Sequence, residues 1–547
     1  MSHVMNEALK PDASAMVESK VNDAPVSVGA ERGALIGAQM DRVVPLAVVA
    51  LVTLVGLATV TPWPVGAYQD DAIYTVLAKA LATGEGYRML NLPGAPHATH
   101  YPPAYPFFLS LLWRVSPSFP DNIVLFKFAN ALWLGLTALG TYIFARSCLQ
   151  WTRLGAALGA LTGTLAIVVL LVTGVVLSEP MFMAFLFAAL LLSERAAEDK
   201  SLTSAALAGL AGGALTLVRT MGIAIVPATL IIMISRRNYR GALVMVAAAA
   251  VFLVPWNLWL NAWQHEIPPV LMGKYGAYGP WLADGFQQGG APFVRDVIIA
   301  NVMSVHRFLG YFFAPVSAAG ARTAAYVGVL CLTGAGLSIL ARRSPVALLF
   351  LMGYAAITLI WPFDPDRFVI GVWPLFTLCL LAGVRAIWTW KPDQAVLRGG
   401  RIVMLAATVA LMTGFLSFNV RGYRHQFWAS IQRDAGRRAK PMAEWIASNT
   451  APSDVVMTDD DVLIYLYTGR QAAPTSTFLP RERLHPLTHE DNVAAVRAMV
   501  DAYAPRYFIT TSEPGRRAAD ALSIGQQPIL RRHRLIPNAY IYERIGS

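Results

Sequence analysis

The chain has 547 residues, of which 56% are hydrophobic and only 14% are charged. Soluble proteins carry about 25% charged residues, so this composition excludes an ordinary soluble protein. The formal net charge of +11 does not indicate nucleic-acid binding, because the Lys and Arg residues of the apolar region fall in short clusters between hydrophobic runs. Cytoplasmic loops of membrane proteins have that distribution. We therefore expect a polytopic membrane protein, surrounded by membrane lipids, with no nucleic-acid partner.

Residues 1–42 are polar and rich in Ala, Ser and Val, which predicts a disordered segment. Arg32 and Arg42 precede the first hydrophobic run and place this segment in the cytoplasm. It lacks the pattern of a cleaved signal peptide, so the first run is expected to remain as an anchor. The three cysteines lie in or beside apolar segments and predict no extracellular disulfide framework.

Residues 43–420 contain eleven runs that reach or approach the roughly 20 apolar residues needed to cross a bilayer. Two further apolar stretches, 104–115 and 298–315, are predicted to lie at the membrane surface, because counting both as spans would move some basic clusters outside. Ten to thirteen spans remain compatible with the sequence. The predicted spans are residues 43–62, 122–145, 154–174, 176–192, 202–217, 221–234, 241–262, 324–341, 346–362, 368–388 and 402–418.

This topology places a first outer loop, 63–121, and the C-terminal region, 421–547, on the extracytoplasmic side. Strands are predicted at 455–458, 506–511 and 539–544, with helices at 441–448 and 516–522. Alternating strands and helices predict a small α/β domain. The fold class is therefore mainly α, with a helical transmembrane domain followed by this outer domain.

Two adjacent carboxylates, Asp70 and Asp71, follow the first span and open an amphipathic helix that Gly84 would end. One interpretation is that Asp70 only caps this helix. A single Asp would suffice for that, and charges close to hydrocarbon are costly. We therefore favour a catalytic role for both.

Two histidines, His97 and His100, stand before a stiff Tyr101-Pro-Pro turn. With the nearby Asp pair they could hold a divalent metal. The alternative is that both are solvated loop histidines. No other cofactor is indicated.

Further charges follow the later spans. Glu179, between Ser178 and Pro180, is predicted to be catalytic, or else to stabilise a helix N-terminus. Arg219 and Arg367 are predicted to bind phosphate, because a guanidinium fork contacts two oxygens at once. The alternatives are a snorkelling interfacial Arg and an ion pair of Arg367 with Asp366.

The outer stretch 263–295 contains Lys274 and Tyr275, followed by Tyr278 and Trp281. This aromatic segment could cover a cleft for a lipid substrate, or form an aromatic belt at the membrane surface. Both interpretations stay open on the sequence.

Several short motifs follow one another in a fixed order along the chain. They are Tyr-Gln-Asp-Asp-Ala-Ile-Tyr (68–74), Tyr-Pro-Pro-Ala-Tyr-Pro (101–106), Leu-Ser-Glu-Pro-Met-Phe (177–182), Arg-Thr-Met-Gly (219–222), Asp-Arg-Phe (366–368) with Trp-Pro (373–374), and positions 445–446, 449, 454–456 and 468–470 of the C-terminal region. Together they resemble the GT-C superfamily of membrane glycosyltransferases, and most closely its branch of protein O-mannosyltransferases and lipid A aminoarabinose transferases.

The resemblance implies a polyprenyl-phosphate sugar donor, a lipid, glycan or protein acceptor outside the membrane, and a place in the bacterial inner membrane with the site on the periplasmic side. It carries the first-loop acid over to Asp70, with Asp71 where relatives often have Glu, and the second outer acid to Glu179. It implies a phosphate contact at Tyr101, where the aminoarabinose branch has Lys. We expect the substrate pocket to contain Tyr68 and Tyr105 of these motifs, together with Lys274 and Tyr275 of the outer stretch.

We therefore expect an inverting membrane glycosyltransferase in which Asp70 acts as the base and Arg367, with Arg219, neutralises the lipid phosphate. A transporter or flippase of a lipid-linked saccharide is the rival hypothesis, although transporters usually bind substrate near the bilayer midplane. A ligase that transfers a whole glycan is the second alternative.

Overall fold

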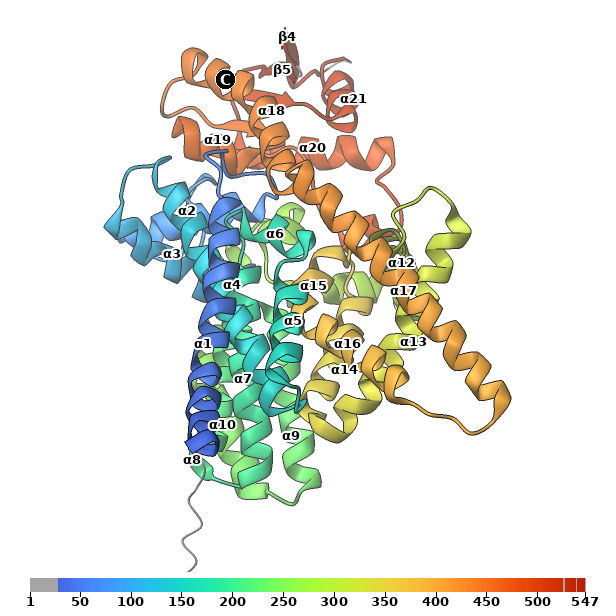
Figure 1. Ribbon diagram of the computed structural model, residues 1–547. Coiled ribbons are helices and arrows are strands. Elements are labelled where there is room, and N and C mark those ends of the chain that lie inside the picture. The colour runs from blue at the N-terminus through green and yellow to red at the C-terminus, as the bar shows by residue number, and fades with distance from the viewer. Residues whose placement is uncertain (1–27, 525–526, 538, 547) are drawn as a thin grey trace, which may run out of the picture. The chain divides into compact units, whose positions relative to one another are not determined.

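The computed structural model describes residues 28–524, 527–537 and 539–546. Most of the chain is helical, and one small sheet lies near the C-terminus (Figure 1). The chain divides into two compact units, Met1–Val44 and Pro45–Ser547, and the site described below lies in the second. The predicted disordered segment falls mainly on residues 1–27, outside the described part, whereas 28–42 belong to helix α1 (Val28–Ala58).

Apolar helices occur at every predicted span. Six are long and apolar enough to cross a membrane, and the pair α5 and α6, bent by 59°, makes a seventh if it is one span. The remaining four are shorter apolar helices, so a count of eleven spans stays a prediction. After α1 these helices are α4 (Asn122–Ser147), α5 (Arg153–Thr164), α6 (Ile167–Thr173), α7 (Glu179–Asp199), α8 (Leu202–Val218), α9 (Ile225–Ser235), α10 (Tyr239–Trp263), α13 (Ala319–Arg343), α14 (Pro345–Ile360), α16 (Trp373–Thr389) and α17 (Ala395–Arg424).

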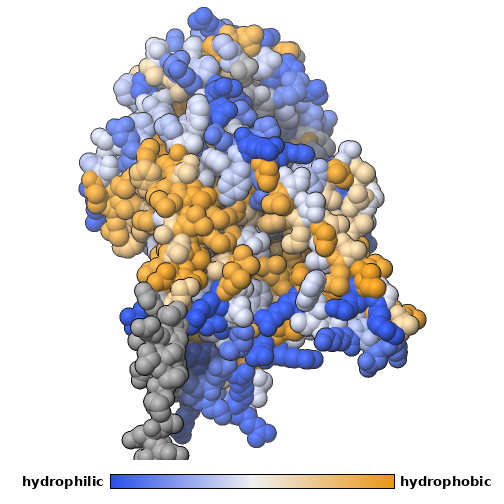
Figure 2. Space-filling view, in the orientation of Figure 1, coloured by the Kyte–Doolittle hydropathy of each residue, from blue (hydrophilic) through white to orange (hydrophobic). Residues whose placement is uncertain are grey.

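Hydrophobic side chains gather on the surface of these helices. Figure 2 shows them between hydrophilic side chains at the top and bottom of the view. Leu132, Leu136, Leu154 and Leu158, on α4 and α5, are among the exposed ones. A water-soluble protein rarely exposes so continuous an apolar surface, so this face is suited to lipid.

Other helices, most of them short, connect the apolar ones. The two stretches predicted to lie at the membrane surface are helical: 104–115 is α3, and 298–315 falls in a longer helix that Gly290, with φ of +57°, interrupts. Gly84 ends the helix of the Asp pair in a left-handed conformation, as predicted. The connecting helices are α2 (Asp70–Thr83), α3 (Ala104–Val115), α11 (Met272–Tyr275), α12 (Tyr278–Phe313), α15 (Asp366–Gly371), and the 3-10 turns η1 (Thr220–Ala224), η2 (Gln264–Glu266), η3 (Pro269–Leu271) and η4 (Pro480–Arg483).

The C-terminal region is called the outer domain below, after its predicted side of the membrane, and its described residues form a five-stranded sheet in the order β2-β1-β3-β5-β4. Strands β2, β1 and β3 are parallel, and β3, β5 and β4 are antiparallel. The three predicted strands correspond to β1, β3 and β5, and the two predicted helices to parts of α18 and α21. The elements are α18 (Phe427–Asn449), β1 (Val456–Thr458), α19 (Asp461–Thr468), β2 (Ala472–Pro474), α20 (His489–Tyr503), β3 (Tyr507–Thr510), α21 (Glu513–Leu522), β4 (Leu530–Ile536) and β5 (Ala539–Arg544).

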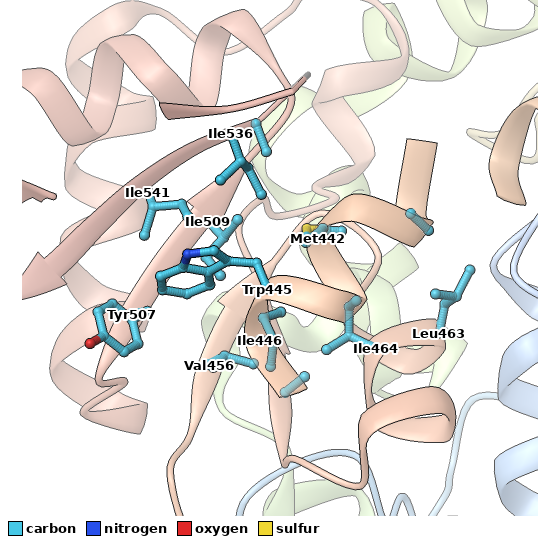
Figure 3. Close-up of a cluster of buried hydrophobic side chains, with 13 residues drawn as sticks. Met442, Trp445, Ile446, Val456, Leu463, Ile464, Tyr507, Ile509, Ile536 and Ile541 are labelled. Atoms are coloured by element: carbon cyan, nitrogen blue, oxygen red, sulfur yellow. The ribbon is translucent and has the colours of Figure 1, made fainter. Parts of the chain in front are cut away.

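One buried cluster holds α18 against this sheet (Figure 3). Trp445 and Ile446 of α18 pack with Val456, Tyr507 and Ile541, which come from β1, β3 and β5. The rings of Trp445 and Tyr507 pack edge-on, with their centroids 5.1 Å apart. Because α18 follows the last apolar helix directly, this core fixes the sheet close to the transmembrane helices.

The outer domain also contacts the segments on both sides of α2, at Asn91 after the helix and at Gly66 before it. The backbone N–H of Ala472 donates to the carbonyl of Asn91 at 2.7 Å. Gly66, with φ of +106°, lies against Leu463, and a Cβ at this position would overlap the Leu463 side chain. The first outer loop therefore packs tightly against the outer domain.

We expect Gly66→Ala to lower the apparent Tm of the detergent-solubilised protein. Overpacking costs about 1–3 kcal/mol, and the left-handed φ adds strain for any residue with a Cβ. Gly84→Ala is the matched control, because Gly84 has φ of +86° with no atom near its added Cβ. Equal losses of Tm in the two variants would contradict a close fit between Gly66 and Leu463.

Candidate active site

The two neighbouring carboxylates at the start of α2 have different surroundings. Asp71 is buried, and its Oδ2 accepts from the backbone N–H of Gly66 at 2.8 Å and of Ala67 at 3.2 Å. Its Oδ1 accepts from the N–H of Tyr68 at 3.1 Å. Burial raises the pKa of Asp71, and these backbone bonds offset only part of the rise. Asp71 therefore fastens the loop in front of α2.

Asp70 has no capping bond to its helix, because the N-cap residue is Gln69. Its Oδ2 lies 2.8 Å from Nη1 of Arg367, and its Oδ1 accepts from the hydroxyl of Tyr101 at 2.9 Å. Burial raises the pKa of Asp70, but Arg367 and Tyr101 more than offset this, so that the pKa is lowered. Asp70 is thus an ionised carboxylate, and about 24% of its side chain is exposed.

Arg367, in α15, also contacts a second acid, Glu179. Its Nη2 and Nε donate to Oε1 of Glu179 at 2.9 and 3.2 Å. Arg219 also reaches Oε1 of Glu179, at 3.0 Å, and donates to the hydroxyl of Ser178 at 3.0 Å. The alternative pairing of Arg367 with Asp366 is not formed. The result is a continuous charge chain of Asp70, Arg367, Glu179 and Arg219.

The charge chain joins residues from four parts of the sequence. Asp70 and Glu179 begin α2 and α7, Arg367 lies in α15, and Arg219 follows α8 directly. Glu179 is completely buried, and its Oε2 has no hydrogen-bond partner among the described residues. A buried carboxylate requires cations close by, so Glu179 holds both guanidinium groups in place.

A cavity of about 290 Å³ opens beside the charge chain. Asp70, Arg219 and Arg367 line it, whereas Glu179 does not. It therefore presents two guanidinium groups and one carboxylate to a ligand. The cavity is further lined by residues that include Tyr101, Tyr278, Trp361, Phe363, Asp364 and Asp366.

An apolar groove of about 480 Å³ adjoins this cavity. Pro102 and Val218 line the cavity, and their chain neighbours Pro103 and Leu217 line the groove. The groove is formed almost entirely by hydrophobic and aromatic side chains, among them Leu81, Tyr87, Phe107, Val251, Phe252 and Trp256. A cavity that contains charged groups and an apolar groove thus share the Pro-Pro turn as a common wall.

The predicted pocket residues are only partly brought together. The guanidinium of Arg367 lies over the ring of Tyr68 at 5.4 Å. Tyr105 is buried beside the cavity and donates to Asn130 at 3.0 Å. Lys274 and Tyr275 face the outer domain, where they donate to Ser476 and to the carboxylate of Asp461. The segment with Lys274 and Tyr275 therefore joins the outer domain and does not line the cavity.

The contacts of the two histidines do not support a metal site. His97 Nδ1 lies 2.9 Å from Oε2 of Glu266, and its ring stacks on Trp263. His100 Nδ1 bonds the carbonyl of Gly276 at 2.7 Å, and burial lowers its pKa to about 4. Within the described part of the chain, no three His, Cys, Asp or Glu side chains are grouped so as to hold a metal ion.

Some residues of the site were not predicted to take part. Tyr74 bonds Ser178 at 3.1 Å, and both lie inside the motifs already noted, at the positions that carry the acids. Asp364 and Asp366 line the cavity, although the sequence suggested Asp366 only as a partner for Arg367. The fixed order of the motifs was the signal that could have identified Tyr74 and Ser178.

No family model and no curated protein matches the sequence. Among solved structures, the crystal structure of ArnT from Cupriavidus metallidurans bound to undecaprenyl phosphate matches with a TM-score of 0.53. The match covers 92% of this chain and 98% of that one, at 13% sequence identity. The apo structure of the same protein matches with a TM-score of 0.47 over 95% of this chain and 99% of that one, also at 13% identity. The match to the undecaprenyl-phosphate-bound structure shows that the chain has the fold of ArnT.

Proposed function

We propose that this protein is a membrane glycosyltransferase that moves a sugar from a polyprenyl-phosphate donor to an extracytoplasmic lipid, glycan or protein. The observation that carries the proposal is the charge chain, of which Asp70, Arg219 and Arg367 line a cavity that adjoins an apolar groove. A lipid-linked sugar has the matching arrangement of a polar head, one phosphate and a long apolar tail. The likeness in fold to ArnT, whose structure contains undecaprenyl phosphate, supports the same ligand class.

The donor phosphate binds beside Arg367 and Arg219, and its isoprenoid tail occupies the apolar groove. Both guanidinium groups line the cavity, and a guanidinium fork matches phosphate oxygens. Burial of each CH₂ of the tail contributes about 0.8 kcal/mol. The tail therefore supplies most of the affinity, and the two Arg residues fix where the phosphate lies.

In the transfer step, an acceptor hydroxyl attacks the anomeric carbon of the sugar. The bond between this carbon and the phosphate oxygen breaks, and its electrons leave on polyprenyl phosphate. The acceptor proton passes to the carboxylate of Asp70. Attack opposite the phosphate inverts the anomeric centre, and Arg367 with Arg219 stabilises the charge that develops on the leaving phosphate.

The pairing with Arg367 controls how strong a base Asp70 is. In the free protein this cation and Tyr101 hold the pKa of Asp70 low. A donor phosphate at Arg367 adds a negative charge close to Asp70, which raises its pKa. Asp70 thus becomes an effective base only when the donor is bound.

Glu179 and Asp71 act as positioning residues in this mechanism. Glu179 does not reach the cavity, and it orients both guanidinium groups through one carboxylate oxygen. Asp71 holds the loop from Gly66 to Tyr68 and so fixes the start of α2. Neither touches the reacting atoms.

The test uses purified protein in liposomes with radiolabelled undecaprenyl-phosphate sugars and a bacterial envelope extract as acceptor. A glycosyltransferase forms labelled acceptor and free undecaprenyl phosphate in equal amounts. A flippase moves the donor between leaflets without consuming it, and a ligase requires a preassembled glycan. Intact donor after full incubation with every sugar and acceptor fraction would contradict the proposal.

Asp70→Asn should abolish most transfer, because loss of a positioned base typically costs about 10²–10⁴-fold in rate. Undecaprenyl phosphate should still bind, since Arg367 and Arg219 remain. The measurement is initial rate together with the Kd for undecaprenyl phosphate. Asp393→Asn, at an exposed position outside the site, is the control and should retain wild-type rate. Wild-type turnover in Asp70→Asn would refute its role as the base.

Arg367→Gln should raise the Kd for undecaprenyl phosphate and also lower the Tm, because Glu179 loses one of its two cations inside the protein. Removing one partner of a buried ion pair typically costs about 3–5 kcal/mol. The double variant Arg367→Gln with Asp70→Asn removes one charge of each sign and leaves Glu179 paired with Arg219, so it should recover part of the Tm without recovering donor affinity. Donor affinity restored along with Tm would show that Arg367 acts only on folding.

A further inference from the structure

One wall of the cavity combines aromatic rings with carboxylates. It consists of Tyr278, Trp361, Phe363, Asp364 and Asp366, and is called the acidic-aromatic wall below. The rings of Tyr278 and Trp361 meet edge-on at 5.0 Å, and Tyr278 meets Phe363 at 6.5 Å. The mechanism described above gives this wall no role.

Buried polar contacts hold the wall in position. Asn301 of α12 donates to the carbonyls of Trp361 at 2.7 Å and of Leu359 at 3.1 Å. The Asn301 carbonyl oxygen accepts from Arg483 of the outer domain at 2.8 and 3.0 Å. Phe363 also packs against Phe478 at 4.6 Å. The wall is therefore a preorganised surface braced from the outer domain.

The two carboxylates in the wall have unused capacity to accept hydrogen bonds. The Asp366 N–H donates to Asp364 Oδ1 at 3.3 Å. Oδ1 of Asp366 is buried and has no partner among the described residues. Burial and the nearby Asp364 raise the pKa of Asp366 to about 7, although Arg307 and Arg483 act against this. Carboxylates of this kind accept hydrogen bonds from hydroxyl or ammonium groups, and they repel a phosphate.

We propose that the acidic-aromatic wall binds the sugar ring of the lipid-linked donor and selects among sugars. The inference rests on the proposed function and names the sugar subsite within it. A sugar ring has apolar C–H faces that pack on aromatic rings, and hydroxyl groups that donate to carboxylates. Asp364 and Asp366 would accept from these hydroxyls while Tyr278 and Trp361 contact the ring.

The proposed sugar subsite lies next to the proposed position of the donor phosphate. Asp364, Asp366 and Arg367 line the same cavity. The anomeric carbon is joined to the donor phosphate through a single oxygen. A phosphate held by Arg367 therefore brings the sugar within reach of the wall, whereas the tail leaves past Pro103 into the apolar groove.

The test compares binding of undecaprenyl phosphate with binding of undecaprenyl-phosphate glucose, mannose, galactose and arabinose. In the wild type, at least one sugar-bearing lipid should bind more tightly than undecaprenyl phosphate alone. Asp366→Asn should weaken that lipid about 10- to 100-fold, the range expected for hydrogen bonds to a charged group. Asp366→Asn should leave the affinity for undecaprenyl phosphate unchanged within about twofold. Trp361→Phe keeps an aromatic ring and should also leave this affinity unchanged within about twofold. Asp393→Asn is the control.

Three results separate the possibilities. Equal weakening of both kinds of lipid by Asp366→Asn would overturn the sugar subsite. No preference of the wild type for any sugar-bearing lipid over undecaprenyl phosphate would overturn it as well. Failure of the wild type to bind undecaprenyl phosphate at all would instead overturn the proposed function. A Tm of Asp366→Asn equal to that of wild type shows that any loss arises in the folded protein.

Discussion

The charge chain depends on one constraint, which is the burial of Glu179. A carboxylate removed from water costs several kcal/mol unless cations compensate it. Here Oε1 of Glu179 takes bonds from both Arg219 and Arg367. Arg367 is thereby held where its remaining nitrogen meets Asp70 at 2.8 Å. The position of the exposed catalytic candidate therefore follows from a buried acid that no ligand needs to touch.

A second constraint comes from the outer domain. Asp71 fastens the loop before α2, Gly66 in that loop packs against Leu463, and Asn91 bonds β2. Arg483, in η4 of the outer domain, braces the acidic-aromatic wall through Asn301. The outer domain thus supports two separate walls of one cavity. We interpret it as a scaffold for the site, whatever it binds in addition.

The sequence predicted which residues would meet but not how they pair. Asp70, Glu179, Arg219 and Arg367 stood out because charges beside apolar runs are costly. Periodicity placed Asp70 and Asp71 together at a helix start, yet adjacent helical side chains point about 100° apart, so only the fold shows which one meets Arg367. Strand β2 has only three residues, and β4 contains the polar run Arg531 to Arg534, so neither has the alternation that marks a strand.

Under the proposed function, the distribution of charge in the cavity would give a bound donor one favoured orientation. Arg219 and Arg367 would attract the phosphate, whereas Asp364 and Asp366 would repel it and accept from hydroxyls. Because the groove beyond Pro103 is apolar, only the tail fits there. In the proposed mechanism, these three preferences would place the anomeric carbon between the cations and the acids, close to Asp70. Asp70 would then gain basicity when phosphate binds at Arg367, so that one chain of charges would both orient the donor and prepare the base.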